Sequence, residues 1–349
     1  MTLKNNTNLN FEVFIIDNGN TLKSNLNLPH TNYIHIINNK NLGGSGGFTR
    51  GIMEVLNSNL NGTLFTHLLL MDDDIVFDPE VIFKTITFLQ LIKSDYTNTF
   101  LAGSMLKLDK PTIQHEAAGY YNSLFIKSLN SNLDLGKSEA IIKNLKPHKA
   151  DYAAWWYCVI PLESINKNNL PLPFFIKSDD IEYSLRVSRQ IITLNGICVW
   201  HKSFASKDAP YLMYYIIRNR LITNALHKQN TYFTNILLII ARYLRAIQKN
   251  LQAIPFIKKA FLDFLKGPDF FLEIDGEQLN NELKEMQKQY EKKDNKVVLL
   301  FSALKNCPLL IIKFLLKPTI SLNYKKSFPN LVSWESWCKR LNYYFQNDE

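Results

Sequence analysis

The chain has few cysteines, and they are not spaced like those that bind zinc. Its 349 residues include four cysteines, far apart and without a CxxC pair: Cys158, Cys198, Cys307 and Cys338. This argues against a disulfide framework and against a zinc site. The sequence also lacks an apolar run of 18 residues, so we expect no membrane-spanning helix. Its polar first residues lack the apolar core of a signal peptide, which predicts a cytoplasmic protein.

Common nucleotide-binding and nucleic-acid-binding signatures are also absent. The chain has neither a Walker loop with GK[ST] nor a GxGxxG dinucleotide fingerprint. No recognition motif for nucleic acid is present, so we expect no nucleic-acid partner. The net charge of +9 still favours anionic partners such as nucleotides or phospholipid headgroups. With 46% hydrophobic and 20% charged residues, the composition is that of a globular protein with ample core.

The most informative segment is LLLMDDDIVFDPE, residues 68–80. Its apolar start predicts a buried strand that ends in three consecutive carboxylates. Side chains alternate along a strand, so Asp72 and Asp74 would face one side and Asp73 the other. Two such carboxylates suit Mg²⁺ or Mn²⁺. From these residues alone a solvated acidic turn, with Asp73 and Asp74 capping the next helix, is an equal interpretation.

The first half of the chain alternates between strand and helix patterns. This alternation predicts an α/β sheet with ligands at the carboxyl ends of its strands. We expect strands at 11–16, 33–37, 68–71 and 100–105, and helices at 48–60 and 79–93.

A glycine-rich segment lies between the second strand and the first helix. Gly43, Gly44, Gly46 and Gly47 are predicted to form a loop before a helix that begins at Phe48. Glycines there allow a ligand to approach the backbone, and a helix N-terminus attracts phosphate. A flexible turn has the same composition, so this segment alone indicates little.

A second pair of carboxylates, Asp179 and Asp180, falls at a predicted strand-to-helix junction. Ser178 or Asp179 would cap this helix, and one acid can have a structural role while its neighbour does chemistry. The strand GICVWH ends in His201, which is a candidate third metal ligand beside the first acidic group.

Two adjacent tryptophans, Trp155 and Trp156, lie in a predicted strand at 151–161. Neighbouring side chains in a strand face opposite sides, so one ring would be in the core and the other exposed to bind a sugar. Burial of both rings in the core is an equal interpretation.

The last third is predicted to be helical. Residues 232–263 and 297–318 are apolar with interspersed lysines and arginines, whereas 278–296 predicts a solvated helix. Each apolar segment is either a buried core helix or a helix in a membrane interface. We divide the chain into a catalytic domain at 1–230 and a helical region at 231–349.

Seven motifs in this order resemble the galactofuranosyltransferases of inverting glycosyltransferase family 2, which have the GT-A fold. They are NxGGxGGFxRG, MDDD, SMLxLxxPxxxHEAxG, WWYC, FIKSDDIEYSLR, WHKSF and YYIIRNRL, within residues 41–221 of a similarity that spans about 11–290. The resemblance implies an α/β, Rossmann-like GT-A domain followed by a C-terminal helical region. The chain lacks the motif QxxRW, so nothing suggests a processive, cellulose-synthase-like enzyme.

The resemblance also implies roles for individual residues. Asp72, Asp74 and His201 would coordinate a divalent cation, Mn²⁺ or Mg²⁺, that bridges the diphosphate of a UDP-sugar. Asp180 would be the general base for the acceptor hydroxyl, and Asp179 would help to hold the acceptor or the sugar.

Further residues would line the donor and acceptor pockets. Glu116 would contact the acceptor, and Trp155 and Trp156 would frame the two sugars. The residues expected along the donor are Asp17, Asn41, Gly43, Gly44, Gly46, Arg50 and Asp73. The expected donor is UDP-galactofuranose, and the expected acceptor is a cell-surface or lipid-linked glycan at the inner face of the plasma membrane. A different donor, such as an activated rhamnose, is an alternative.

The sequence departs from the family pattern at its start. The family has a strand and a loop before the segment that contains Asp17, whereas only ten residues precede Phe11 here. We therefore expect a central strand of the sheet to be missing. Three interpretations are open: a start codon further upstream, a strand from a second polypeptide, or an inactive remnant.

Overall fold

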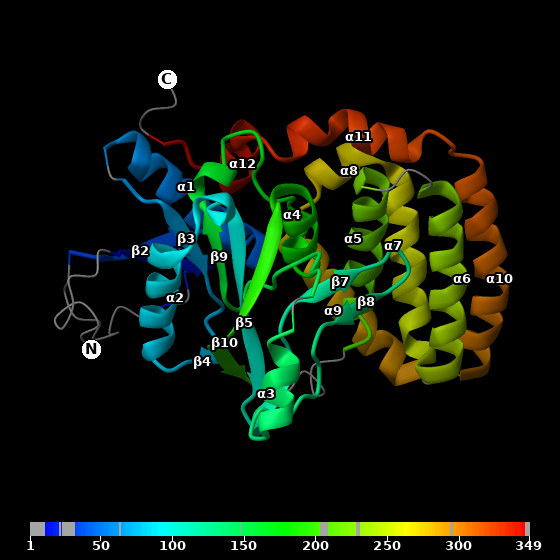
Figure 1. Cartoon of the computed structure of the whole chain (residues 1–349). Helices are drawn as coiled ribbons and strands as arrows, with labels where there is room; N and C mark the ends of the chain where they lie inside the picture. The colour runs from blue at the N-terminus through cyan, green and yellow to red at the C-terminus, as the bar shows by residue number, and fades with distance from the viewer. Residues whose placement is uncertain are drawn as a thin grey trace.

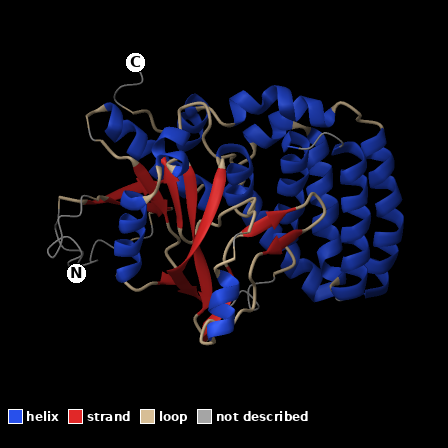
Figure 2. Cartoon of the chain, in the orientation of Figure 1, coloured by secondary structure: helices blue, strands red, loops and turns tan. Residues whose placement is uncertain are grey.

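The computed structural model describes residues 11–20, 22, 32–62, 64–146, 148–202, 209–227, 231–293 and 296–345. Figures 1 and 2 show two parts side by side: a mixed sheet with helices around it, and a bundle of long helices. The α/β class expected from the sequence is confirmed, and so is the helical region that follows it.

The main sheet has six strands of mixed direction. Its order is β3 (His67–Leu70), β9 (Cys158–Pro161), β5 (Thr99–Lys107), β10 (Gln190–His201) and β4 (Ile75–Val76), and β6 (Lys110–Glu116) also pairs with β5. Only β5 and β10 run parallel; the other neighbours are antiparallel. All but the last residue of β5 are buried, as its central position requires.

A separate parallel pair precedes this sheet. It consists of β1 (Val13–Asn18) and β2 (Ile34–Asn39), and α1 (Gly43–Leu60) packs against β1 and contacts β3. Within the described ranges, no strand links β1 to β3 by hydrogen bonds. The two sheets are therefore separate in the described part of the chain, and the expectation of a missing strand stays a prediction.

Shorter elements surround the sheet. They are α2 (Glu80–Leu91), the hairpin of β7 (Gly119–Tyr121) and β8 (Ile126–Ser128), α3 (Ser138–Asn144) and α4 (Asp179–Val187). The segment with the two tryptophans is a turn before β9, so the predicted strand at 151–161 is largely wrong.

The helical region follows, and its described residues form eight α-helices. They are α5 (Leu212–His227), α6 (Thr231–Lys249), α7 (Ile254–Lys266), α8 (Pro268–Glu273), α9 (Gly276–Lys293), α10 (Lys296–Leu315), α11 (Ile320–Leu331) and α12 (Trp334–Leu341). The apolar segment at 232–263 is therefore two helices and not one. Asn250 caps a short 3₁₀ turn, and Pro255 occupies the first turn of α7, where its missing N–H costs nothing.

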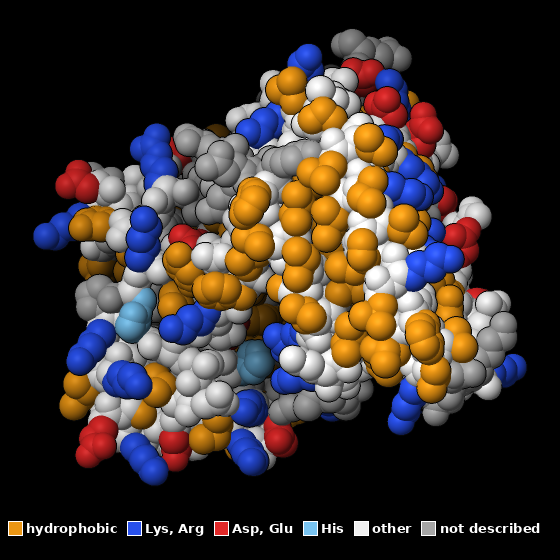
Figure 3. Space-filling view, turned by 90° about the vertical axis from the view of Figure 1, so that its right-hand side faces the viewer, with side chains coloured by type: hydrophobic (Ala, Val, Ile, Leu, Met, Phe, Trp, Pro, Cys, Tyr) orange, Lys and Arg blue, Asp and Glu red, His pale blue; other side chains and the backbone are white. Residues whose placement is uncertain are grey.

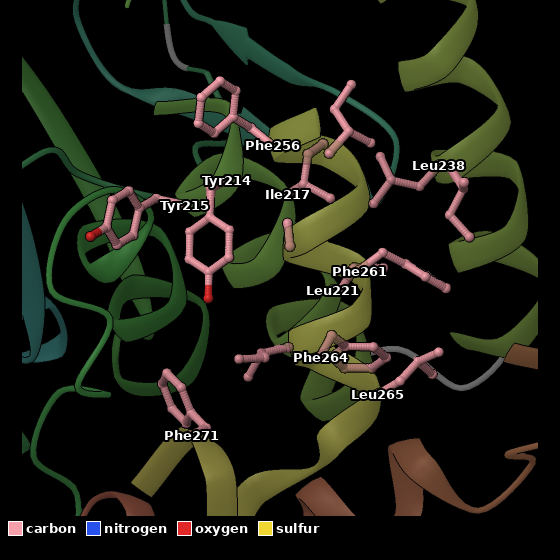
Figure 4. Close-up of a cluster of buried hydrophobic side chains, with 14 of the residues drawn as sticks. Tyr214, Tyr215, Ile217, Leu221, Leu238, Phe256, Phe261, Phe264, Leu265 and Phe271 are labelled. Carbon is pink, nitrogen blue, oxygen red and sulfur yellow. The ribbon is translucent and has the colours of Figure 1, made fainter. Parts of the chain in front are cut away.

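Aromatic side chains from α5 and α7 form the core of the bundle. Tyr214, Phe256, Phe261 and Phe264 are fully buried there (Figure 4). For α7 the buried-core interpretation is thus confirmed. By length and composition α10 could cross a membrane, so our expectation that no segment would qualify is wrong. Only 28% of its most apolar window is buried inside the protein.

The end of the chain returns to the α/β part. In Figure 1, α12 lies beside α1. The indole N–H of Trp337 donates to the carbonyl of Pro171 over 2.9 Å, and Trp334 and Phe345 join the apolar cluster that includes Ile52. The two parts are therefore tied together at both ends of the helical region.

Candidate active site

The acidic turn and His201 meet at one edge of the sheet. Strand β3 ends at Leu70, and Asp72, Asp73 and Asp74 form the turn that leads to β4. Because β4 pairs with the end of β10, His201 lies opposite Ile75. Its Nε2 is 3.0 Å from Oδ1 of Asp74.

The surroundings of His201 fit a cation ligand. Its Nδ1 hydrogen-bonds to the backbone oxygen of Lys202, which requires the proton on Nδ1. In the neutral ring the lone pair of Nε2 then faces the carboxylate of Asp74, so a proton or a cation between them is needed for attraction. Metal-binding histidines usually donate their other N–H to a carbonyl or carboxylate in this way.

Asp72 adds negative charge at the same place. Burial and, to a smaller extent, the charges of Asp74, Asp179 and Asp73 together raise the pKa of Asp72 to about 6, against a lowering by His201. A divalent cation would offset this repulsion. However, within the described residues no three His, Cys, Asp or Glu side chains form a ready-made metal cluster. Coordination by Asp72, Asp74 and His201 therefore stays a prediction.

Asp179 and Asp180 begin α4 beside this group. The Ser45 hydroxyl donates to Oδ2 of Asp179 over 2.8 Å, which joins α4 to the first turn of α1. Ser178 makes no capping bond with its side chain, so that part of the capping prediction is wrong. Burial raises the pKa of both acids, and the charge of Asp179 raises that of Asp180 further. A carboxylate with a raised pKa is a stronger base near neutral pH.

Glu116 approaches Asp180 from the end of β6. It is 5% exposed and accepts hydrogen bonds from the hydroxyls of Ser128 and Tyr152. Burial raises the pKa of Glu116 to about 7, and its charge in turn raises the pKa of Asp180. The structure thus brings together the predicted base and the predicted acceptor-binding acid. Sequence reasoning missed Tyr152, for which no motif spacing gives a signal.

The loop before α4 has an unusual backbone. The φ values are 74° for Phe175, 68° for Lys177 and 69° for Ser178. Residues other than glycine rarely adopt this backbone region. Such strain persists only where the surroundings hold it in place, and it is concentrated at functional sites.

Helix α5 supplies that support. Asn219 donates to the carbonyls of Ile176 and Lys177 over 2.9 and 2.7 Å, and Arg218 donates to the carbonyl of Phe174 over 2.8 Å. Both donor side chains belong to the RNR part of the motif YYIIRNRL. Polar residues in an otherwise apolar helix were the available signal for this role, and sequence reasoning did not use it.

The glycine-rich segment differs from its prediction. It forms the first turns of α1, which begins at Gly43 and not at Phe48. A Cβ on Gly43 would lie 2.2 Å from the carbonyl oxygen of Phe175, and one on Gly46 would lie 2.3 Å from Leu42. These glycines thus permit close packing of protein on protein; only Gly44 faces open space. Donor contact by Gly43, Gly44 and Gly46 stays a prediction.

Other residues of the predicted donor site are held by the protein itself. Asn41 donates to Glu277 and accepts from the backbone N–H of Gly43. Arg50 is paired with Glu54 and lies over the ring of Tyr343, which indicates a packing role.

Asp17 is buried within β1 and not after it, and it accepts the N–H of Leu22. Trp155 is in the core, edge-on to Phe48 and Tyr183. Trp156 is half-buried and donates to the carbonyl of Gly103. The two rings thus differ in burial, but neither is widely exposed. The last two residues of the WHKSF motif, 203 and 204, lie outside the described residues.

Comparison with known proteins agrees with the motifs. No family model matches the chain. Galactofuranosyltransferase GlfT2 of Mycolicibacterium smegmatis is 32% identical over 258 residues, which cover 68% of this chain and 38% of that protein. The chain is similar to galactofuranosyltransferases. The protein of the same name from Mycobacterium tuberculosis is 29% identical over 260 residues, 67% of this chain and 39% of its own length. The chain thus spans about two fifths of the length of these relatives.

Proposed function

We propose that this galactofuranosyltransferase-like chain is an inverting glycosyltransferase that moves galactofuranose from UDP-galactofuranose to a hydroxyl of a cell-surface or lipid-linked glycan. The observation that carries the proposal is the position of Asp180 at the start of α4, where its carboxyl group interacts electrostatically with Glu116 and with Asp179, which in turn interacts with Asp72 of the acidic turn. The likeness to two galactofuranosyltransferases supports the choice of donor.

In this proposal the residues divide the work. Asp180 takes the proton of the acceptor hydroxyl, for which it must approach within roughly 2.6–3.2 Å. Glu116 and Tyr152 orient the acceptor, and Asp179 is fixed by Ser45. The leaving group is a diphosphate, so it needs neutralisation of charge more than a proton. A cation held by Asp72, Asp74 and His201 would supply this as a Lewis acid.

The first test measures UDP release from UDP-galactofuranose in the presence of a galactofuranose-containing acceptor and Mn²⁺. We expect Asp180→Asn to lower the rate of transfer about 10²–10⁴-fold, because the base is lost. Binding of UDP, followed by calorimetry, should be unchanged. The exposed Asp95→Asn is the matched control and should keep full activity. Full activity of Asp180→Asn would contradict the assignment.

The same calorimetric measurement tests the metal site. We expect UDP to bind more tightly with Mn²⁺, and Asp74→Ala to lose that gain because a ligand is removed. Mn²⁺-dependent binding that survives in Asp74→Ala would refute this role of Asp74.

The lack of hydrogen bonds between the β1–β2 pair and the main sheet, among the described residues, favours a second candidate, a non-catalytic subunit. This candidate predicts that UDP does not bind, either with Mn²⁺ or without it. If UDP binds but UDP-galactofuranose is not consumed, other UDP-sugars and an activated rhamnose are the donors to test next.

A further inference from the structure

A broad apolar surface covers the outer side of the helical bundle. Figure 3 shows hydrophobic side chains gathered over α6 and α10, with lysines and arginines at the border. On α6 the exposed members include Phe233, Leu237 and Leu244, and on α10 they include Phe301, Leu304 and Ile312. We call these two helix faces the α6–α10 face. Exposed apolar patches of this kind mark surfaces that bind a partner or a membrane.

The face is formed by helices that already pack on the protein. The opposite side of α10 contributes Leu299, Ala303, Leu310 and Phe314 to the interior, and α10 contacts both α6 and α7. Phe301 and Leu304 are nevertheless 67% and 59% exposed. Each helix is therefore two-sided, with one apolar side in the core and a second one on the surface.

The charges of this region are all of one sign. Neither α6 nor α10 contains an aspartate or glutamate, and the sequence has none from 231 to 262 or from 296 to 334. The exposed cations within the two helices are Arg245, Lys249, Lys296, Lys305 and Lys313. Beyond the two helices, next to Leu316, which is 76% exposed, a hollow is lined by Lys266, Lys317 and Lys326 and by one acid, Asp269.

We propose that the α6–α10 face docks the protein onto an anionic phospholipid bilayer, with both helices lying in the interface. Exposed apolar side chains would enter the boundary of the acyl chains while lysine and arginine meet the headgroups. A second copy of the chain fits less well, because it would bring uncompensated cations together across the contact. The proposal does not depend on the proposed enzymatic activity.

The bilayer is contacted and not crossed by α10. Although α10 is long enough to span, Lys305 lies in its middle and Pro308 interrupts its hydrogen bonding. A lysine at the centre of a spanning helix is strongly disfavoured, whereas at the interface its ammonium group remains with the headgroups.

The test is flotation of the full chain with two kinds of vesicle: phosphatidylcholine alone, and equal parts of phosphatidylcholine and phosphatidylglycerol. We expect binding to the anionic vesicles about tenfold tighter or more, and weakened by salt. The double variant Phe301→Asp/Leu304→Asp should lose at least about tenfold of this affinity. Because both side chains are exposed, the variant should fold, which its melting curve checks.

Two further variants make the test specific. Lys305→Glu/Lys313→Glu should lose the preference for anionic vesicles, whereas Leu91→Asp, at a 77% exposed apolar position on α2, should bind like the wild type. The proposal is overturned if the wild type does not bind anionic vesicles, or if Phe301→Asp/Leu304→Asp binds them equally well. A wild-type dimer that the double variant disrupts, without any binding to vesicles, would also overturn it and identify a protein interface.

Discussion

At the scale of single residues, the carboxyl groups around Asp180 determine how the candidate site responds to pH. Burial is the main cause of the raised pKa of Asp180, and the charges of Asp179 and Glu116 raise this pKa further. Glu116 is itself shifted, to a pKa of about 7. A site with three such groups cannot carry three full charges at neutral pH without a cation or a bound proton.

The shift at Glu116 predicts a pH dependence of stability. Below about pH 4.5 the carboxyl is protonated in the folded and unfolded states, so it costs nothing. As the pH rises to about 7, the unfolded chain ionises it while burial opposes ionisation in the fold. The free energy of unfolding should therefore fall by about 3 kcal/mol over this range, relative to Glu116→Gln.

Urea unfolding of both proteins at about pH 5 and pH 8 measures this difference. The exposed Glu139→Gln serves as control and should follow the wild type. An equal pH dependence of the wild type and Glu116→Gln would show that burial does not shift Glu116.

At the scale of elements, α5 holds the strained loop before α4. The carbonyls of Ile176 and Lys177 depend on one amide group, that of Asn219. We expect Asn219→Ala to lower kcat about tenfold or more, because Asp179 and Asp180 follow this loop directly. It should also destabilise the fold by about 1–3 kcal/mol, since buried acceptors lose their donor.

The readout that separates positioning from simple loss of stability is UDP affinity at a temperature where the variant is folded. It should be nearly unchanged while kcat falls. Asn306→Ala, whose amide bonds only to Ser302 within its own helix, is the control and should keep wild-type kcat. A proportional loss of activity in both variants would contradict a special role for the loop.

Elements with a strong local pattern were predictable from the sequence, and those set by distant contacts were not. The apolar run before Asp72 and the strand that ends at His201 form as expected, because burial and alternation specify them locally. The early start of α1 depends instead on Phe175 and Asn18, which approach its glycines from elsewhere in the fold. The electrostatic interaction of Glu116 with Asp180 is of the same kind: the motifs suggested both residues, but only the folded chain brings them near each other.

At the scale of the whole molecule, the helical region is built into the α/β part at two points. Helix α5 holds the loop before α4, and α12 packs beside α1 after the chain has passed through the bundle. The boundary we predicted at residue 230 follows α5 directly. The residues named here as supporting the candidate base, Ser45, Glu116 and Asn219, all precede that boundary.

The return of α12 to α1 has a consequence for proteolysis. A cut between α10 and α11 would leave a C-terminal fragment that still packs through α11 on α5 and through Trp337 on Pro171. We expect the two pieces to separate on a denaturing gel but to elute as one peak from a native column. Replacing Trp337 with alanine should release the fragment, because a large buried ring and its hydrogen bond would both be lost. The last helix would therefore keep the two pieces of a cleaved chain associated.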